Sequence, residues 1–279
     1  MTTPALIDLH HQGAERVIGV YVVETADGMA LFDCGPSSCV PTLRAGLAER
    51  GLALADVRHL LLSHIHLDHA GAAGTLVREH PALQVHVSGV GAPHLVDPSR
   101  LERSARRLYG GTFDTLWGEL VPVPQQNVHV VGDEVLGLEC FPAPGHASHH
   151  VCYVGSDGTL YAGDAAGVRI QPDSYVLPPT PPPDVDVEAW ERTIGELEAR
   201  DPARLALIHF GVVDDVRPHL AILRERLREW AELVAGGASQ EEFEAAVGPV
   251  PETYERAMPL WQSYQGLARW AETRRGEAA

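Results

Sequence analysis

The sequence predicts an α/β (α+β) fold, in which helices cover β-sheets. Short apolar segments with strand character alternate with helix-like segments over the first two thirds of the chain, which is typical of layered sheets and helices. Polar residues of metal-ligating types follow directly after several of these strands. With 279 residues and 45% apolar content, the chain can bury a large core, as one large domain or a domain with an appendage.

The predicted strands are short apolar or alternating segments bounded by turn residues. They span residues 17–24, 28–33, 57–62, 83–88, 128–131, 134–141, 150–154, 159–162 and 205–208. Helices are predicted at 41–51, which Gly51 ends, at 72–80, before Pro81, and at 187–200. The first elements therefore run strand, strand, helix, strand, helix, strand, as expected of a sheet covered by helices.

Two segments interrupt this pattern. Residues 89–120 lose the strand rhythm and are predicted to form a helical insertion, a wall or lid over the neighbouring strand ends. Six prolines fall within residues 171–183. A proline tract can be a docking ligand for a partner, but a stiff connector over residues 171–185, passing across the sheet, is the favoured interpretation.

The chain is predicted to be helical after residue 209. Apolar residues recur at intervals of three and four between Leu220 and Val234, and Ser239 to Glu242 form a capping box. A last helix at 252–274 carries aromatic residues that would suit the core or a homodimer interface, with substrate stacking as an alternative. We therefore expect a first domain at residues 1–214 and a C-terminal helical extension at 215–279.

Composition excludes several classes of protein. A formal charge of −17 argues against nucleic acid as a partner, because that affinity depends on clustered basic residues. The basic stretches at 100–107 and 224–228 also contain Glu and are interpreted as solvated helix faces. No apolar segment is long enough to span a bilayer, and no signal peptide is recognisable. Four cysteines without a Cys-x-x-Cys pair indicate reduced thiols, so we expect a cytoplasmic protein without a membrane partner.

Three histidines and an aspartate lie within six residues, directly after the strand 57–62. They are His64, His66, Asp68 and His69. Burying unpaired His and Asp is costly, so a core strand would not end in four of them without a partner, and the natural partner is a divalent metal. In an extended segment His64 and His66 point the same way, whereas Asp68 and His69 diverge, which suggests more than one ion. A surface histidine cluster is the alternative.

Three further candidate ligands arrive at strand ends. His146 follows the strand 134–141, Asp164 closes a predicted hairpin, and His209 ends the last strand. Each comes after apolar or small residues, so we expect the side chains to gather at one edge of a sheet. Singly, His146 or His209 would more often be a structural histidine, but with the four residues above they form a coherent set of seven.

Two residues are predicted to support these ligands. Asp33 ends the strand 28–33 and is followed by Cys34 and Gly35. It could belong to the turn alone, or accept a hydrogen bond that orients a metal-bound imidazole. Ser63 directly precedes the first histidine and is assigned the same supporting position.

The motif His-x-His-x-Asp-His at residues 64–69 resembles that of the metallo-β-lactamase-fold hydrolase superfamily, as do Pro-Gly-His at 144–146, Gly-Asp at 163–164 and the strand-terminal histidine. The resemblance covers residues 17 to about 212. It implies a four-layer αββα sandwich with metals at one end of two packed sheets. It also implies that one aspartate bridges two triads of ligands. The first triad is His64, His66 and His146, the second is Asp68, His69 and His209, and the bridge is Asp164.

No single branch of the superfamily is matched in full. His150, four residues after His146, is similar to the glyoxalase II pattern, yet Ile-His-Phe-Gly at 208–211 differs from the Gly-His-Glu-Tyr of those thioesterases, and their basic glutathione-binding residues are not evident. The start of the motif is also similar to acyl-homoserine lactonases, but Ala165, Ala166 and Gly167 stand where their catalytic tyrosine would follow the bridging aspartate.

These features predict a binuclear hydrolase acting on a small molecule. A hydroxide bridging two divalent ions, zinc first and manganese or iron otherwise, would attack an ester, thioester or lactone carbonyl. Asp68 is the candidate that orients the hydroxide and shuttles its proton. His150 would donate to the developing oxyanion or only support a ligand; both roles stay open. No Gly-x-Ser-x-Gly and no Cys-His signature offers another nucleophile.

Three other functions are compatible with parts of this pattern. A mononuclear iron dioxygenase acting on persulfides would use His66, His146 and Asp164 as a two-His-one-carboxylate triad. A phosphodiesterase or nuclease is disfavoured by the net charge. A non-catalytic binding protein would more naturally have lost a ligand.

Overall fold

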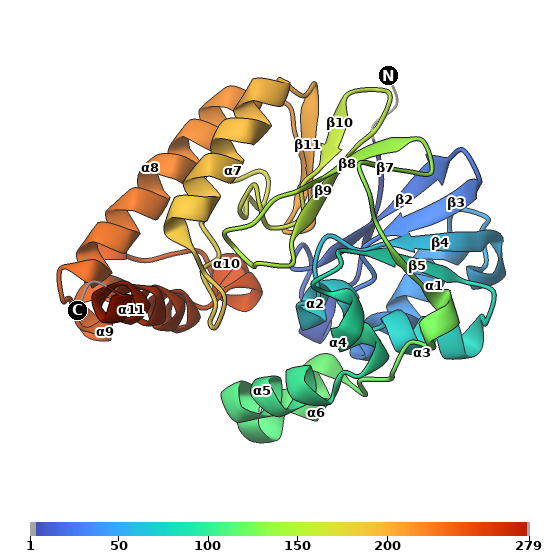
Figure 1. Cartoon of the computed structure of the whole chain (residues 1–279), viewed down its shortest axis with the longest axis horizontal. Helices are drawn as coiled ribbons and strands as arrows, with labels where there is room; N and C mark the ends of the chain where they lie inside the picture. Colours follow the sequence, from blue (N-terminus) through green and yellow to red (C-terminus); the bar gives the residue numbers. More distant parts are fainter. Residues whose placement is uncertain (1–3, 278–279) are drawn as a thin grey trace.

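The first sheet gathers strands from the N-terminal half of the chain (Figure 1). The computed structural model describes residues 4–277. The first three strands pair antiparallel and the rest parallel, in the order in which they occur in the sequence. The strands are β1 Ala5–Asp8, β2 Gly19–Thr25, β3 Gly28–Phe32, β4 Val57–Leu61, β5 Gln84–Val87 and β6 Val128–Val130.

The second sheet is built from later strands in the order β12-β11-β10-β9-β8-β7. All its pairs are antiparallel except β10 with β11. Its strands are β7 Glu134–Val135, β8 Leu138–Pro142, β9 Val151–Val154, β10 Thr159–Tyr161, β11 Arg204–Leu207 and β12 Gly211–Val213. Apolar residues of both sheets, among them Phe32 and Tyr153, share one buried cluster and meet edge to face, so the two sheets pack against each other.

Helices cover the outer face of each sheet. On the first sheet lie α1 Val40–Ala48, α3 Ala73–Glu79 and α4 Ala92–Val96, whose apolar residues join the cluster between and beneath the strands. On the second sheet lie α7 Val187–Arg200 and α8 Val216–Ala235, whose residues Trp190 and Leu220 belong to a second buried cluster. The predicted αββα sandwich is therefore confirmed.

The C-terminal helices share the core of the second sheet. They are α9 Gln240–Val247, α10 Glu252–Ala257 and α11 Leu260–Glu277. Tyr254, Met258 and Trp270 are buried in the cluster that also holds Trp190. The core position expected of these aromatic residues is thus confirmed for Tyr254 and Trp270, whereas the domain boundary at residue 214 stays a prediction.

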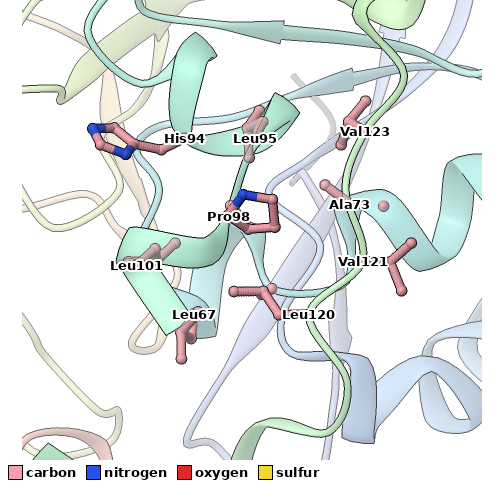
Figure 2. A pocket seen from close by; sticks show the side chains of 12 residues that line it. Leu67, Ala73, His94, Leu95, Pro98, Leu101, Leu120, Val121 and Val123 are labelled. Atoms are coloured by element: carbon pink, nitrogen blue, oxygen red, sulfur yellow. The ribbon is translucent and has the colours of Figure 1, made fainter. Parts of the chain in front are cut away.

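The insertion is helical, with α5 Ser99–Tyr109 and α6 Phe113–Trp117 set apart at the lower end of the molecule (Figure 1). A small apolar cluster attaches it to α2 Leu67–Ala70: Leu67 packs with Ala105 and Phe113. Figure 2 shows Leu67 beside Leu101 at a cavity of about 10 Å³, room for one water at most. Close packing therefore holds the insertion against the segment that carries His66 and Asp68.

Three local predictions were wrong, and the edge strand β1 was not predicted at all. The chain after residue 209 was expected to be helical, but β12 forms a short edge strand there. The single strand 134–141 is a hairpin, because Leu136 and Gly137 adopt left-handed turn conformations with φ of 55° and 83°. The single last helix is two helices, because Pro259 lacks the amide that a continuous helix needs and Met258 is extended.

Within residues 4–277, no helix is both long enough and apolar enough to cross a bilayer.

Candidate metal centre

The seven predicted ligands meet at one end of the two sheets. Four of them follow β4, in the loop and the short helix α2 that come after Leu61. His146 lies in the loop between β8 and β9, Asp164 follows β10, and His209 follows β11. All but His66 and Asp68 are fully buried, with at most 1% of their surface exposed. Residues far apart in sequence therefore share one buried site.

Three histidines form the first group of candidate ligands. His64 Nε2 lies 3.0 Å from His66 Nδ1, and His146 Nε2 lies 2.9 Å from His66 Nδ1 and 3.2 Å from His64 Nε2. Three imidazole nitrogens facing one another at such distances suit a common metal ion better than any hydrogen bond, since one metal can accept all three lone pairs.

The second group consists of Asp68, His69 and His209. Asp68 Oδ2 lies 3.3 Å from His209 Nε2 and 3.7 Å from His69 Nε2. Asp164 lies between the two groups: its Oδ2 is 3.4 Å from His146 Nε2, and its Oδ1 is 3.4 Å from His69 Nε2 and 3.6 Å from His209 Nε2. One carboxylate oxygen thus faces each group.

Hydrogen bonds on the outer side fix which nitrogen faces inward in four of the five candidate histidines. His69 Nδ1 donates to Asp33 Oδ2 at 2.8 Å, and His146 Nδ1 donates to the Pro179 carbonyl at 2.8 Å. The Nδ1 atoms of His209 and His64 are bonded in the same way. Their acceptors are the Val17 carbonyl at 2.5 Å and Ser63 Oγ at 2.9 Å. In all four rings the Nε2 lone pair is left free for a metal.

The two supporting residues, Asp33 and Ser63, belong to one hydrogen-bond network. The Asp33 carboxylate accepts hydrogen bonds from the Ser63 amide at 2.7 Å, the Ser63 hydroxyl at 2.8 Å and His69 Nδ1. The hydroxyl proton of Ser63 is therefore used, and its oxygen is free to accept from His64. Asp33 adopts φ of 57°, an uncommon conformation for a residue other than glycine, and its carboxylate reaches both Ser63 and His69. Of its two expected roles, this geometry is that of the acceptor.

The inward atoms fit a bound cation. Among residues 4–277, His69 Nε2, His209 Nε2 and Asp164 Oδ1 are buried polar atoms without a hydrogen-bond partner. Burying such atoms unpaired is costly, and all three face the second group. Imidazole nitrogen and carboxylate oxygen are the donor types that zinc, manganese and iron accept, so the donor chemistry agrees with the geometry.

Electrostatics separate the two groups. Burial, with His69 and His66 nearby, lowers the pKa of His64 well below its usual value, and burial with His146 lowers the pKa of His66 to about 3. Burial also opposes the charged form of His69, but Asp164, Asp68 and Asp33 together raise its pKa well above the usual value. The first group is thus held neutral and ready to ligate, while the second group concentrates negative charge that a cation would balance.

Two glycines allow the loops that carry His146 and Asp164 to pack closely against neighbouring segments. Gly145 has φ of 136°, and a Cβ there would lie 2.2 Å from Trp190 Cβ. Gly163 has φ of 48°, and a Cβ there would lie 2.6 Å from Ser63 Cβ and 2.7 Å from His150 Nε2. The Gly before His146 and the Gly before Asp164 are therefore required by backbone conformation and by close contact.

His150 lies behind the ligands. Its Nε2 accepts a hydrogen bond of 3.2 Å from the Asp164 amide, and its ring stacks on His64 with centroids 4.8 Å apart. It is 1% exposed and does not line the large cavity beside the ligands. Of its two expected roles, the geometry favours support of Asp164 over donation to an oxyanion. His149, which the sequence did not single out, also packs on His64 and His66.

A cavity of about 670 Å³ opens beside the ligands. Its wall includes His66, Asp68 and Asp164, and residues of the insertion and the C-terminal helices. His11 and Tyr109 also line it; His11 stacks on Trp117, and Tyr109 meets Trp117 edge to face. Sequence reasoning did not identify these two residues, because only the histidine pair at 10–11 gave a signal and no motif surrounds it.

The comparison with known families agrees with this geometry. The family model described as the metallo-beta-lactamase superfamily matches residues 15–209, which include all seven candidate ligands. The chain belongs to the metallo-β-lactamase superfamily. Membership in this superfamily implies divalent metal binding, for which the His and Asp groups above are the candidate ligands.

Solved structures of the superfamily share the fold. A family protein from Thermus thermophilus, TTHA1429, superposes with a TM-score of 0.68 at 24% identity, over 94% of this chain and 89% of the other. ST1585 from Sulfolobus tokodaii superposes with a TM-score of 0.65 at 21% identity, over 98% of each chain. TTHA1623, solved in a di-iron-bound form, gives 0.56 at 24% identity over 74% of this chain and 91% of the other.

The curated relatives match this chain over only part of their length. ST1585 from Sulfurisphaera tokodaii is 26% identical over 61% of this chain and 65% of its own length. A hydroxyacylglutathione hydrolase from Xanthomonas campestris is 30% identical over 52% of this chain and 45% of its own length. The matched region thus spans less than two thirds of these metallo-β-lactamase-superfamily relatives, and their activities are not carried over with the fold.

Proposed function

We propose that the protein is a binuclear metal-dependent hydrolase that cleaves an ester, thioester or lactone of a small molecule. The observation that supports this most directly is Asp164, whose two carboxylate oxygens face two separate groups of candidate ligands at 3.4 to 3.6 Å. A hydrolase among the curated relatives, named hydroxyacylglutathione hydrolase, agrees with this class of reaction.

His64, His66 and His146 would hold one ion, and Asp68, His69 and His209 the other. Divalent ions in such a site supply Lewis acidity and lower the pKa of a coordinated water towards neutrality. Zinc is the first expectation, and manganese or iron would fit the same donors. The di-iron form of TTHA1623 is a property of that protein, and it illustrates that the fold can accommodate iron.

Asp68 is the residue best placed to handle the proton of the attacking water. Its carboxylate reaches His69 and His209 with one oxygen, yet its side chain is 15% exposed and lines the cavity. It can therefore orient a water molecule toward a bound carbonyl and accept the proton that leaves on attack. No other carboxylate lines the cavity, within the part of the chain that the structure describes, except Asp164, which lies between the ligand groups.

The second group of candidate ligands favours the binuclear hydrolase over the alternative of a mononuclear dioxygenase. A two-His-one-carboxylate iron site needs only His66, His146 and Asp164. It would leave the buried Nε2 atoms of His69 and His209 without a partner, at the cost described above. The binuclear hydrolase accounts for both atoms.

Elemental analysis and a substrate panel test the proposal. Purified protein should contain about two divalent ions per chain and should hydrolyse members of a panel of thioesters, esters and lactones. Asp68→Asn and His146→Ala should abolish most hydrolysis, whereas Asp214→Asn, which removes an exposed carboxylate, should not. One iron per chain with thiol-dependent oxygen uptake, or turnover of phosphodiesters only, would overturn it.

The cytoplasmic location, the small-molecule partner, the absence of nucleic acid and membrane partners, and the homodimer expected from the sequence stay predictions.

A further inference from the structure

The large cavity joins the metal-ligand cluster to a rim of exposed residues. It is lined at one end by His66, Asp68 and Asp164, and its volume of about 670 Å³ is in the range of small-molecule sites. The insertion and helices α10 and α11 supply most of the remaining wall. The chemistry of this wall bears on which substrate the proposed hydrolase would accept.

Positive charge gathers at this cavity, although the chain as a whole is acidic. Three arginines line it, from three different helices: Arg107 of α5, Arg256 of α10 and Arg269 of α11. The described lining contains no acidic residue besides the two ligands Asp68 and Asp164. The chain has 38 acidic and 21 basic residues, so a wall with three arginines and no acidic residue beyond these two departs from the general balance of the chain.

Two of these arginines are not committed to carboxylates of the described residues. Arg106, the neighbour of Arg107 on α5, forms ion pairs with Glu102 and Asp114 at 2.8 Å. Arg107 has no carboxylate within 4.0 Å, in the portion of the chain described. Arg269 donates Nε to the Pro183 carbonyl at 3.1 Å, which positions its guanidinium at the rim without neutralising it.

Apolar side chains line the same cavity as this charge and the candidate ligands. Leu101, Leu108, Leu116 and Met258 line the same cavity, together with the indole of Trp117. Such a wall binds an apolar segment by removing its surface from water, at about 25 cal/mol per Å². A fully polar substrate would gain nothing from it, and a fully apolar one would leave the arginines unused.

We propose that the cavity selects substrates in which an apolar segment separates the scissile carbonyl from an anionic group, carboxylate or phosphate, that Arg107 and Arg269 bind. This substrate class rests on the proposed hydrolytic function. Arg256 contributes less, because it shares its guanidinium with Glu252 at 2.6 Å. The guanidinium fork suits carboxylate and phosphate oxygens alike, so the site recognises the shared anionic chemistry.

A pair of fluorescent probes tests the binding site without requiring turnover. Anilinonaphthalene sulfonate and the uncharged phenylnaphthylamine share an aromatic skeleton and differ in the anion. The metal-loaded protein should bind the sulfonate more tightly than the neutral probe, and added salt should reduce this preference. Arg107→Gln and Arg269→Gln should each weaken sulfonate binding about threefold to fivefold, and the double variant about tenfold, with less than a twofold change for the neutral probe.

Arg103→Gln is the matched control. Arg103 lies one turn before Arg107 on the same helix, is exposed, and is not among the residues that line the cavity. The Arg103→Gln substitution removes the same charge from the same helix and should leave the binding of both probes unchanged. The proposal would be overturned if Arg103→Gln and Arg107→Gln weakened sulfonate binding equally. It would also be overturned if the double variant lost affinity for both probes equally, or if its binding of the sulfonate did not change.

A pair of esters carries the test to the reaction. Mono-nitrophenyl glutarate and nitrophenyl butyrate differ in a terminal carboxylate on the acyl chain. The double variant should lower kcat/KM for the glutarate ester about tenfold and leave the butyrate ester within twofold. If neither ester is cleaved by a metal-loaded protein and the panel above also fails, the hydrolase proposal fails, while the probe pair still decides whether the anion site exists.

Discussion

The indole Nε1 of Trp190 donates a hydrogen bond of 2.8 Å to the carbonyl oxygen of Ala165, the residue that follows Asp164. His219 Nε2 donates to the next carbonyl, that of Ala166, at 2.6 Å. Both side chains are fully buried, one on α7 and the other on α8. Two helices that cover the second sheet therefore hold the loop on which the carboxylate between the ligand groups is carried.

Replacing Trp190 should weaken metal binding as well as folding. Trp190→Phe leaves the Ala165 carbonyl unpaired and removes buried volume, so we expect a loss of about 1 to 3 kcal/mol in the free energy of unfolding, measured in urea. Because the loop of Asp164 loses a support, the affinity for zinc should fall about tenfold, measured by competition with a chromophoric chelator. Trp261→Phe, on partly exposed surface of α11, is the control. Lower stability with unchanged zinc affinity would limit Trp190 to a structural role.

Removing the charge of Asp33 should affect the second ligand group. Asp33 accepts from His69 Nδ1 and so keeps Nε2 free for a metal. An amide in Asp33→Asn can present its NH₂ group to that nitrogen and favour the other tautomer, so affinity for one ion of the proposed binuclear centre should fall about 10- to 100-fold. Metal content after dialysis against a graded chelator series measures this. Retention of both ions at wild-type affinity would contradict the assignment.

Stability should depend on pH through His59 of β4 and His86 of β5, a histidine pair outside the ligand set. His86 Nε2 lies 3.1 Å from His59 Nδ1, and His59 Nε2 lies 3.2 Å from Asp27 Oδ2. Burial, then His59 and His129, lowers the pKa of His86 to about 4. The folded state therefore resists a proton that the unfolded state accepts near pH 6.5, and stability falls as pH falls from about 6.5 towards 4.

This pH effect predicts a loss of about 2 kcal/mol between pH 7 and pH 5 from His86 alone, since one pKa unit corresponds to about 1.4 kcal/mol. Urea unfolding of chelated protein at several pH values measures the slope. His86→Gln should reduce the slope by that amount, whereas His10→Gln, at an exposed position, should not. An unchanged slope in His86→Gln would show that His86 titrates normally in the folded protein.

Leu67 should couple the ligand loop to the insertion. It lies between His66 and Asp68 in sequence and packs with Ala105 and Phe113 of the insertion. Leu67→Ala should lower the free energy of unfolding by about 2 to 5 kcal/mol and speed proteolysis within residues 99–117, because the insertion loses its buried anchor. Val90→Ala, at a side chain that is 56% exposed, serves as control. Equal proteolysis of Leu67→Ala and wild type would mean that the insertion is held by other contacts.

Most of the candidate ligands could be predicted from the sequence, because each one is marked by its position after an apolar strand. His64 to His69 follow an apolar strand, and His146, Asp164 and His209 each come a few residues after a strand. Strands that pack in one sandwich deliver their terminal residues to a common end, so the motif and the strand pattern suffice. Short edge strands such as β1 and β12 escaped prediction, since four or three residues carry too little periodicity.

The sequence by itself thus determined the layered fold and the residues that gather at one end of the sheets, because strand periodicity and side-chain chemistry are local properties. Only the tertiary structure decided which nitrogen of each histidine faces inward, that His150 lies behind Asp164, and that Arg107 and Arg269 share a cavity wall. Those features depend on how the insertion and the C-terminal helices pack over the site. Such packing is a sum of many weak long-range contacts that leave no motif in the chain.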